Sequence, residues 1–134
     1  MEINVNSNKM VDYKSLYKSV ALSEVKVWFE VAPISAFPID GGACVKYSNL
    51  QIAVFNFKRL GKWYACQNLS PEKQEMVLSR GMIGDYKGIP MVACPLHKKK
   101  FSLENGTNFD GDLDPIATYP VKVENNKVYI GFSE

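Results

Sequence analysis

Residues 92–106 read VACPLHKKKFSLENG, and they contain a cysteine and a histidine close together. Cys94 and His97 stand three positions apart, and Pro95 restricts the backbone between them. A thiolate and an imidazole at this spacing resemble half of a metal site, because a closed transition-metal site needs about four donors. A closed site at this stretch therefore requires a second pair of donors from elsewhere in the sequence.

The composition predicts one globular domain. The chain has 134 residues, and 46% of them are hydrophobic, which is enough for a core without disulfide or metal support. The formal net charge of +2 favours neither nucleic acid nor an anionic membrane as a partner. The apolar runs are too short for a membrane span, and the first residues lack a signal-peptide profile. We expect a cytoplasmic protein with three free thiols, Cys44, Cys66 and Cys94.

Short segments rich in β-branched and aromatic residues follow one another from residue 25 to the end of the chain. Turn signals such as Asp40-Gly41-Gly42 and Asn105-Gly106 separate these segments. The pattern predicts an all-β fold, an antiparallel sandwich or incomplete barrel. The expected strands cover residues 25–32, 43–47, 50–57, 62–67, 89–95, 98–103, 118–124 and 127–132.

Two segments depart from this strand pattern. Residues 1–24 are polar, and we expect a partly disordered N-terminal extension with one short amphipathic helix, which packs on its own domain or, as the alternative, on a partner. Residues 70–81 carry the signals of a second helix, with Ser70 as N-cap, Pro71 in the first turn and Gly81 as the stop. The apolar positions of the first helix are Tyr13, Leu16, Tyr17 and Val20.

Within this β pattern, the segment at 92–106 resembles a ligand loop of the Rieske-type iron–sulfur domains. In that family two loops each supply one cysteine and one histidine, as C-x-H and C-x-x-H, to a [2Fe–2S] cluster. Cys94 and His97 match the second of these loops. The resemblance implies a Rieske-like domain over residues 25–134, with a smaller cluster-type subdomain at about 66–104.

A closer resemblance is to the small subunits of assimilatory NAD(P)H-dependent nitrite reductases. It is carried by VLSRGMIGD at 77–85, by VACPLHKKKFSLENG at 92–106 and by TYPVKVE at 118–124. It implies a subunit of the oxidoreductase that reduces nitrite to ammonium in nitrate assimilation. The implied partner is the large subunit, which carries FAD, siroheme and a [4Fe–4S] cluster and performs the chemistry.

The first ligand loop is altered in this chain. Family members that carry a cluster have C-P-H just before the VLSRG stretch, and the equivalent triplet here is Ser70-Pro71-Glu72. The alternative register, Cys66-Gln67-Asn68, loses the proline and still replaces the histidine. A hydroxyl and a carboxylate are hard donors, whereas irons in such clusters prefer thiolate and imidazole. We therefore expect no cofactor and no catalytic residue in this chain, only vestigial cluster positions at Ser70, Glu72, Cys94 and His97.

Other interpretations of these residues stay open. Cys94 also suits a small buried side chain, and His97 suits a hydrogen bond to a turn carbonyl. A mononuclear zinc on Glu72, Cys94 and His97, with Ser70 or water as the fourth ligand, is another hypothesis, as is a metal-sensing or scaffold module. If a [2Fe–2S] cluster does bind, the chain becomes a ferredoxin that carries electrons to an oxygenase.

The basic run beside the second loop has two interpretations of its own. It is either a solvated strand face or a docking patch for the acidic surface of a redox partner. Its residues are Lys98, Lys99 and Lys100.

Overall fold

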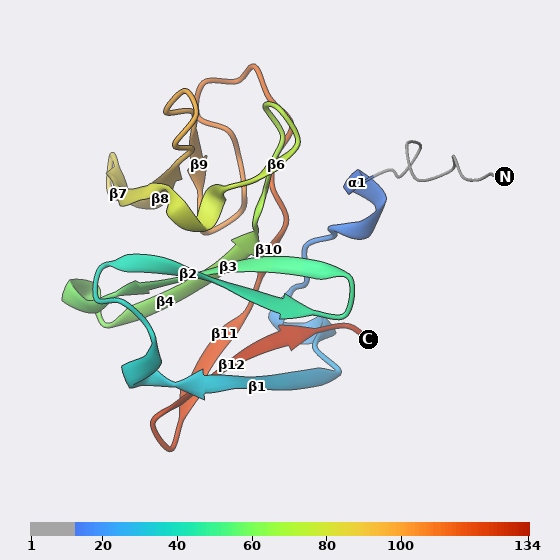
Figure 1. Ribbon diagram of the computed structural model, residues 1–134, viewed down its shortest axis with the longest axis vertical. Coiled ribbons are helices and arrows are strands. Elements are labelled where there is room, and N and C mark those ends of the chain that lie inside the picture. The colour runs from blue at the N-terminus through green and yellow to red at the C-terminus, as the bar shows by residue number, and fades with distance from the viewer. Residues whose placement is uncertain (1–12) are drawn as a thin grey trace, which may run out of the picture.

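In the described part of the chain, apolar and alternating strands pair into four open antiparallel sheets, which confirms the predicted all-β fold (Figure 1). The structure is a computed structural model, and it describes residues 13–134. One sheet has the order β1 (Val27–Pro33), β12 (Lys127–Phe132), β11 (Val121–Glu124). A second has the order β10 (Thr118–Tyr119), β4 (Lys62–Gln67), β3 (Leu50–Phe57), β2 (Gly41–Tyr47).

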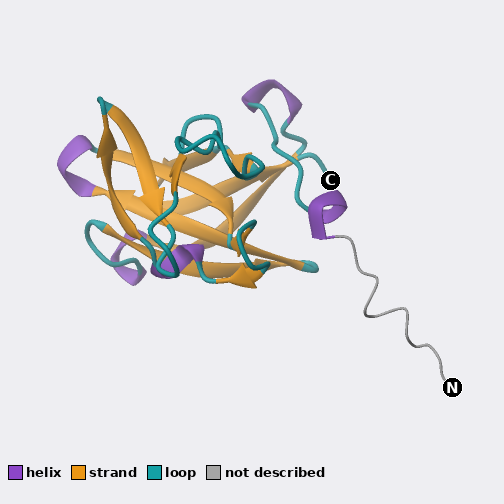
Figure 2. Ribbon diagram, turned by 90° about the horizontal axis from the view of Figure 1, so that it is seen from above, coloured by secondary structure: helices purple, strands orange, loops and turns teal. Residues whose placement is uncertain are grey.

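The other two sheets are small and lie together at the top of Figure 1. One is the hairpin of β5 (Leu69–Ser70) and β6 (Glu75–Met76), and the other is the meander of β7 (Met82–Tyr86), β8 (Ile89–Ala93) and β9 (Lys100–Ser102). Helical turns lie at the periphery of the strands (Figure 2). They are α1 (Tyr13–Leu16) and the 3₁₀ turns η2 (Leu22–Glu24), η3 (Ile34–Ala36), η4 (Lys58–Leu60) and η5 (Leu78–Arg80). Within residues 13–134, no helix has the length and apolar character to cross a membrane.

Strand β3 separates two hydrophobic cores, because successive side chains of a strand point to opposite faces. Ile52 and Val54 belong to the larger core, which the β1–β12–β11 sheet covers. Ala53 and Phe55 belong to a second core, which the small β7–β8–β9 sheet covers. The ligand-loop candidates therefore sit on a small layer stacked against the outer face of the four-stranded sheet.

Several strand limits agree with the sequence prediction, and the differences have local causes. Residues 50–57, 62–67 and 127–132 are strands as predicted. Pro120 divides the predicted strand 118–124 into β10 and β11, since proline has no N–H for a ladder. The sequence pattern does not predict β5, β6 or β7, because two-residue strands and the weakly apolar segment 82–86 carry little local signal.

Residues 70–81 do not form the predicted helix; they form a hairpin and then the single turn η5. The competing element is Asn68, whose backbone carbonyl accepts hydrogen bonds from the N–H groups of Val77 and Leu78. The Asn68 side-chain Oδ1 also accepts a 2.7 Å bond from the Ser79 N–H. These hydrogen bonds take up N–H donors that the interior of a helix over residues 70–81 would use, and they override the local propensity.

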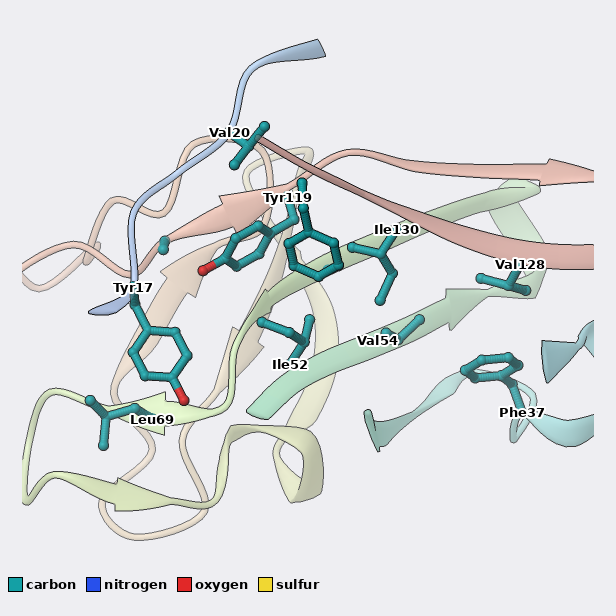
Figure 3. Packing of buried hydrophobic residues seen from close by; sticks show 12 residues of the cluster. Tyr17, Val20, Phe37, Ile52, Val54, Leu69, Tyr119, Val128 and Ile130 are labelled. Carbon is teal, nitrogen blue, oxygen red and sulfur yellow. The ribbon is translucent and has the colours of Figure 1, made fainter. Parts of the chain in front are cut away.

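The segment after α1 packs on its own domain, as predicted, but the helix ends at Leu16. Tyr17 and Val20 are buried in the larger core, where Figure 3 shows them near Tyr119. The Val20 N–H donates to the Thr118 carbonyl, and the Thr118 N–H donates to the Ser19 hydroxyl. This segment therefore covers the edge strand β10. The disorder predicted for the first residues falls outside the described part of the chain.

Tyr17 and Tyr119 are two buried phenols with opposite hydrogen-bond situations. The Tyr17 hydroxyl accepts a 2.9 Å bond from the Gln51 N–H and donates to the Met76 sulfur at 3.9 Å. The Tyr119 hydroxyl is buried and has no hydrogen-bond partner among the described residues. Burial raises the pKa of Tyr119, so this hydroxyl stays neutral.

We expect Tyr17→Phe to lower the free energy of unfolding by about 1 kcal/mol, because the Gln51 N–H loses its acceptor. Tyr119→Phe should leave that free energy unchanged or raise it by up to about 1 kcal/mol, because an unpartnered buried hydroxyl is removed. Urea denaturation of the two variants measures the difference. Equal losses in both variants would contradict this assignment.

Candidate site at two facing loops

The fold brings the predicted ligand positions together from two loops. The first loop (residues 70–74) begins at the end of β5 and leads into β6, and the second loop (residues 94–99) connects β8 to β9. The second loop is closed by two backbone bonds: Lys98 N–H to Cys94 carbonyl at 2.7 Å, and Cys94 N–H to Lys99 carbonyl at 2.8 Å. Lys98 adopts a positive φ of 60° to complete this turn. The two loops face each other, and the residues that contact across them are 24 or 25 positions apart in the sequence.

The inner contact joins Ser70 and Cys94, and both side chains are fully buried. The hydroxyl and the thiol share a hydrogen bond, with 3.3 Å between Oγ and Sγ. The Ser70 oxygen also accepts a 3.3 Å bond from the Glu72 N–H within the first loop. Cys94 belongs to the second hydrophobic core, as its interpretation as a small buried residue predicts.

The outer contact joins Glu72 and His97. The His97 Nδ1 pairs with the Glu72 Oε2, so the histidine contacts a carboxylate and not a turn carbonyl, which was one of its open interpretations. The Glu72 side chain is 15% exposed, and the His97 side chain is 53% exposed. The second carboxylate oxygen, Oε1, is buried and has no hydrogen-bond partner among the described residues. Solvent screens a pair with a half-exposed member, so its direct contribution to stability is below about 1 kcal/mol.

The four positions therefore form two separate pairs. Between residues 13 and 134, the structure has no group of three or more His, Cys, Asp or Glu side chains placed to hold a metal ion. Cys94 is turned toward Ser70, and His97 is turned toward Glu72. The zinc hypothesis for Glu72, Cys94 and His97 stays a prediction for metal analysis.

The basic run is less uniform than its sequence suggests. The Lys99 Nζ lies 2.8 Å from the Asp112 Oδ2, and this hydrogen bond raises the pKa of Lys99 and lowers the pKa of Asp112. Lys100 lies in β9 and is half-buried, whereas Lys98 is exposed at the tip of the second loop. A docking role for Lys98, Lys99 and Lys100 stays a prediction, with Lys98 its most accessible charge.

Asn68 is a positioning residue that the sequence did not reveal. Its side chain is 2% exposed, and its Nδ2 donates to the Gln51 Oε1 at 3.2 Å and the Cys44 sulfur at 3.5 Å. Together with the bond from Ser79, these contacts fix the chain just before the first loop. The available signal was an asparagine next to a Ser-Pro turn, because such side chains often bond to nearby backbone groups.

The three cysteines differ in accessibility. Cys44 is exposed, whereas Cys66 and Cys94 are buried. Burial raises the pKa of the Cys66 thiol strongly, and partial burial also raises that of Cys44 against the opposing effect of Lys46. Thiolate is the reactive form, so a raised pKa slows reaction with a disulfide reagent.

We expect one thiol per folded chain, Cys44, to react with an aromatic disulfide reagent at pH 8, and all three to react in denaturant. Absorbance of the released thiolate counts the reacted groups. Cys44→Ser should abolish the reaction of the folded chain. Rapid reaction of that variant would show that Cys66 or Cys94 is accessible.

Comparisons with known proteins show the family to which this chain belongs. The family model described as "Rieske-like [2Fe-2S] domain" matches residues 27–131 of this chain. The NAD(P)H nitrite reductase large subunit of Klebsiella oxytoca is 38% identical over 104 residues, which are 78% of this chain and 11% of that protein. The NADH nitrite reductase small subunit of Escherichia coli K12 is 27% identical over 103 residues, which are 77% of this chain and 95% of that protein.

A solved structure is similar as well. The solution structure of the NAD(P)H nitrite reductase small subunit from Erwinia carotovora has a TM-score of 0.68 and 31% identity, and the match covers 80% of this chain and 82% of that one. The 3-phenylpropionate/cinnamic acid dioxygenase ferredoxin subunit of Photorhabdus laumondii is 30% identical over 105 residues, 78% of this chain and 93% of that protein. This chain thus spans about a tenth of the Klebsiella relative and most of each smaller one.

Proposed function

Since the chain belongs to the Rieske-like [2Fe–2S] domain family, we propose that it serves as the small subunit of an assimilatory NAD(P)H-dependent nitrite reductase. One observation carries the proposal. Similar segments occur both as a chain named small subunit in Escherichia coli and inside a chain named large subunit in Klebsiella oxytoca. A domain that is separate in one enzyme and fused in a related one supports a lasting association with the large chain.

We propose that the chain works without a cluster of its own, because the donors at the four ligand positions do not fit a [2Fe–2S] centre. The Ser70 hydroxyl holds its proton, and the Glu72 carboxylate is a hard anion, so neither matches an iron–sulfide centre. Only Cys94 and His97 are soft donors, and each is already engaged across the loops by one of the two hard ones. Each iron would keep one protein ligand instead of two.

The contribution of the chain would then be its surface and shape. By family resemblance, the large subunit would hold FAD, siroheme and the [4Fe–4S] cluster and would reduce nitrite to ammonium with electrons from NAD(P)H. The chain would act as a structural or regulatory partner with no catalytic centre of its own. A cytoplasmic location stays the prediction made from the sequence.

The ferredoxin alternative has weaker support. It is supported by the similarity of this chain to a dioxygenase ferredoxin subunit. An electron carrier needs a redox centre, however, and the donor set at Ser70 and Glu72 argues against one. The visible absorption of purified, iron-supplied protein distinguishes the two functions, because a colourless preparation excludes the electron carrier.

Co-expression with a tagged large subunit from the same organism tests the proposal. We expect both chains to co-purify in equal amounts, and a chain that elutes alone would overturn the proposal.

Lys98→Glu should slow association about three- to tenfold if the exposed tip of the second loop docks on an acidic surface. Lys46→Glu, an exposed charge on β2, is the matched control and should have no effect. Surface plasmon resonance gives the rates.

A further inference from the structure

Side chains join the two loops, which belong to different sheets. The first loop belongs to the β5–β6 hairpin and the second to the β7–β8–β9 meander. Within residues 13–134, no strand ladder pairs one of these sheets with the other. Direct hydrogen bonds from loop to loop run between Ser70 and Cys94 and between Glu72 and His97.

The inner pair is a fully buried polar contact at the edge of an apolar core. Ser70 and Cys94 are both fully buried, and a buried hydroxyl is costly unless it is hydrogen-bonded. The partner across the loops is the Cys94 thiol, at 3.3 Å. Separation of the loops would leave the hydroxyl without this bond, so the pair favours the closed arrangement.

The outer pair holds a carboxylate in an unusual position. Glu72 keeps one oxygen on His97 and buries the other without a partner. A carboxylate on a surface loop normally turns both oxygens toward water, since burying one of them unpaired is unfavourable. The contact with His97 offsets part of that cost, and it links the first loop to the second.

We propose that these two pairs form a metal-free clasp (Ser70–Cys94 and Glu72–His97) that joins the loops as a [2Fe–2S] cluster would. The match is pair by pair: Ser70–Cys94 occupies the two cysteine positions, and Glu72–His97 occupies the two histidine positions. The clasp fixes the tip of the domain without iron, so the tip keeps one shape whatever the supply of iron. This inference rests on the proposed cluster-free function, but it concerns the isolated chain.

Amide hydrogen exchange by mass spectrometry, on the isolated full chain, tests the clasp. Wild-type protein should protect residues 94–99 equally with and without a chelator. The double variant Ser70→Ala/Glu72→Gln should exchange about tenfold faster at 94–99, where no residue is changed. Glu75→Gln alters a charge on the same hairpin but outside the clasp, and it should exchange like wild type.

Two outcomes would overturn the clasp: loss of wild-type protection on chelation, or wild-type exchange at 94–99 in the double variant. The proposed function fails separately. A chain with protected loops that does not bind the large subunit would overturn the function and leave the clasp intact.

The correspondence with the ligand positions has its own test. Ser70→Cys/Glu72→His supplies the two missing soft donors, and the variant is incubated anaerobically with Fe²⁺ and sulfide. We expect about two irons per chain and a rhombic electron-spin signal after reduction, while the wild type stays iron-free. Uptake of two irons by the wild type, or none by a variant with wild-type circular dichroism, would overturn the pair-by-pair match.

Discussion

Gly106→Ala is expected to lower the free energy of unfolding by about 2–4 kcal/mol, a large share of the stability of a domain of this size. Gly106 adopts a φ of 84°, and a Cβ there would lie 1.9 Å from the Ile116 carbonyl oxygen. The Ile116 backbone cannot easily retreat, because its N–H donates to the Gly106 carbonyl at 2.9 Å and its side chain is buried. Left-handed strain of about 1 kcal/mol then adds to an overpacking cost of about 1–3 kcal/mol.

Gly111→Ala is the matched control for this prediction. Gly111 has a φ of 78°, but a Cβ there would meet nothing within 4 Å. It should therefore cost only the strain, about 1 kcal/mol. Chemical denaturation of both variants separates strain from collision. Equal losses would mean that the approach of Gly106 to Ile116 has no energetic weight.

Asn68→Ala is expected to lower the free energy of unfolding by about 3 kcal/mol. The variant removes an acceptor for the Ser79 N–H and a donor for the Gln51 side chain, at a residue that is 2% exposed. Buried groups that lose their partners cost about 1–3 kcal/mol each. Because Asn68 fixes the chain before the first loop, we also expect faster amide exchange at residues 77–80.

Asn105→Ala is the control for Asn68→Ala. Its side chain accepts one 3.0 Å bond from the Thr107 N–H in an exposed turn, where water replaces a lost partner. A loss of about 0.5 kcal/mol is expected. Thermal denaturation and hydrogen exchange compare the two variants. Similar effects would contradict the positioning role of Asn68.

The fold was predictable where its signals are local. Apolar runs between turn residues gave the limits of β3, β4 and β12, since a strand's pattern and its turns lie in one short stretch. The segment 70–81 was mispredicted for the opposite reason. Its local helix signals were weak. Hydrogen bonds to Asn68, which lies outside the segment, hold residues 77–79 in an arrangement other than the predicted α-helix.

The candidate site was predictable in identity but not in geometry. The spacing of Cys94 and His97, together with the family resemblance that adds Ser70 and Glu72, indicated these positions, and donor chemistry argued against a cluster. The spacing did not reveal that Ser70 would bond to Cys94 or that Glu72 would pair with His97. The sequence also did not reveal that Lys99 forms an ion pair with Asp112.

Residue types and their local order were enough to specify the β architecture, the family and the shortage of soft donors, because these properties belong to short stretches of chain. Folding alone decided how the substituted ligand positions are used. Contacts between loops 24 or 25 residues apart depend on how β5–β6 and β8–β9 pack over the second core, and no short stretch of sequence encodes that packing.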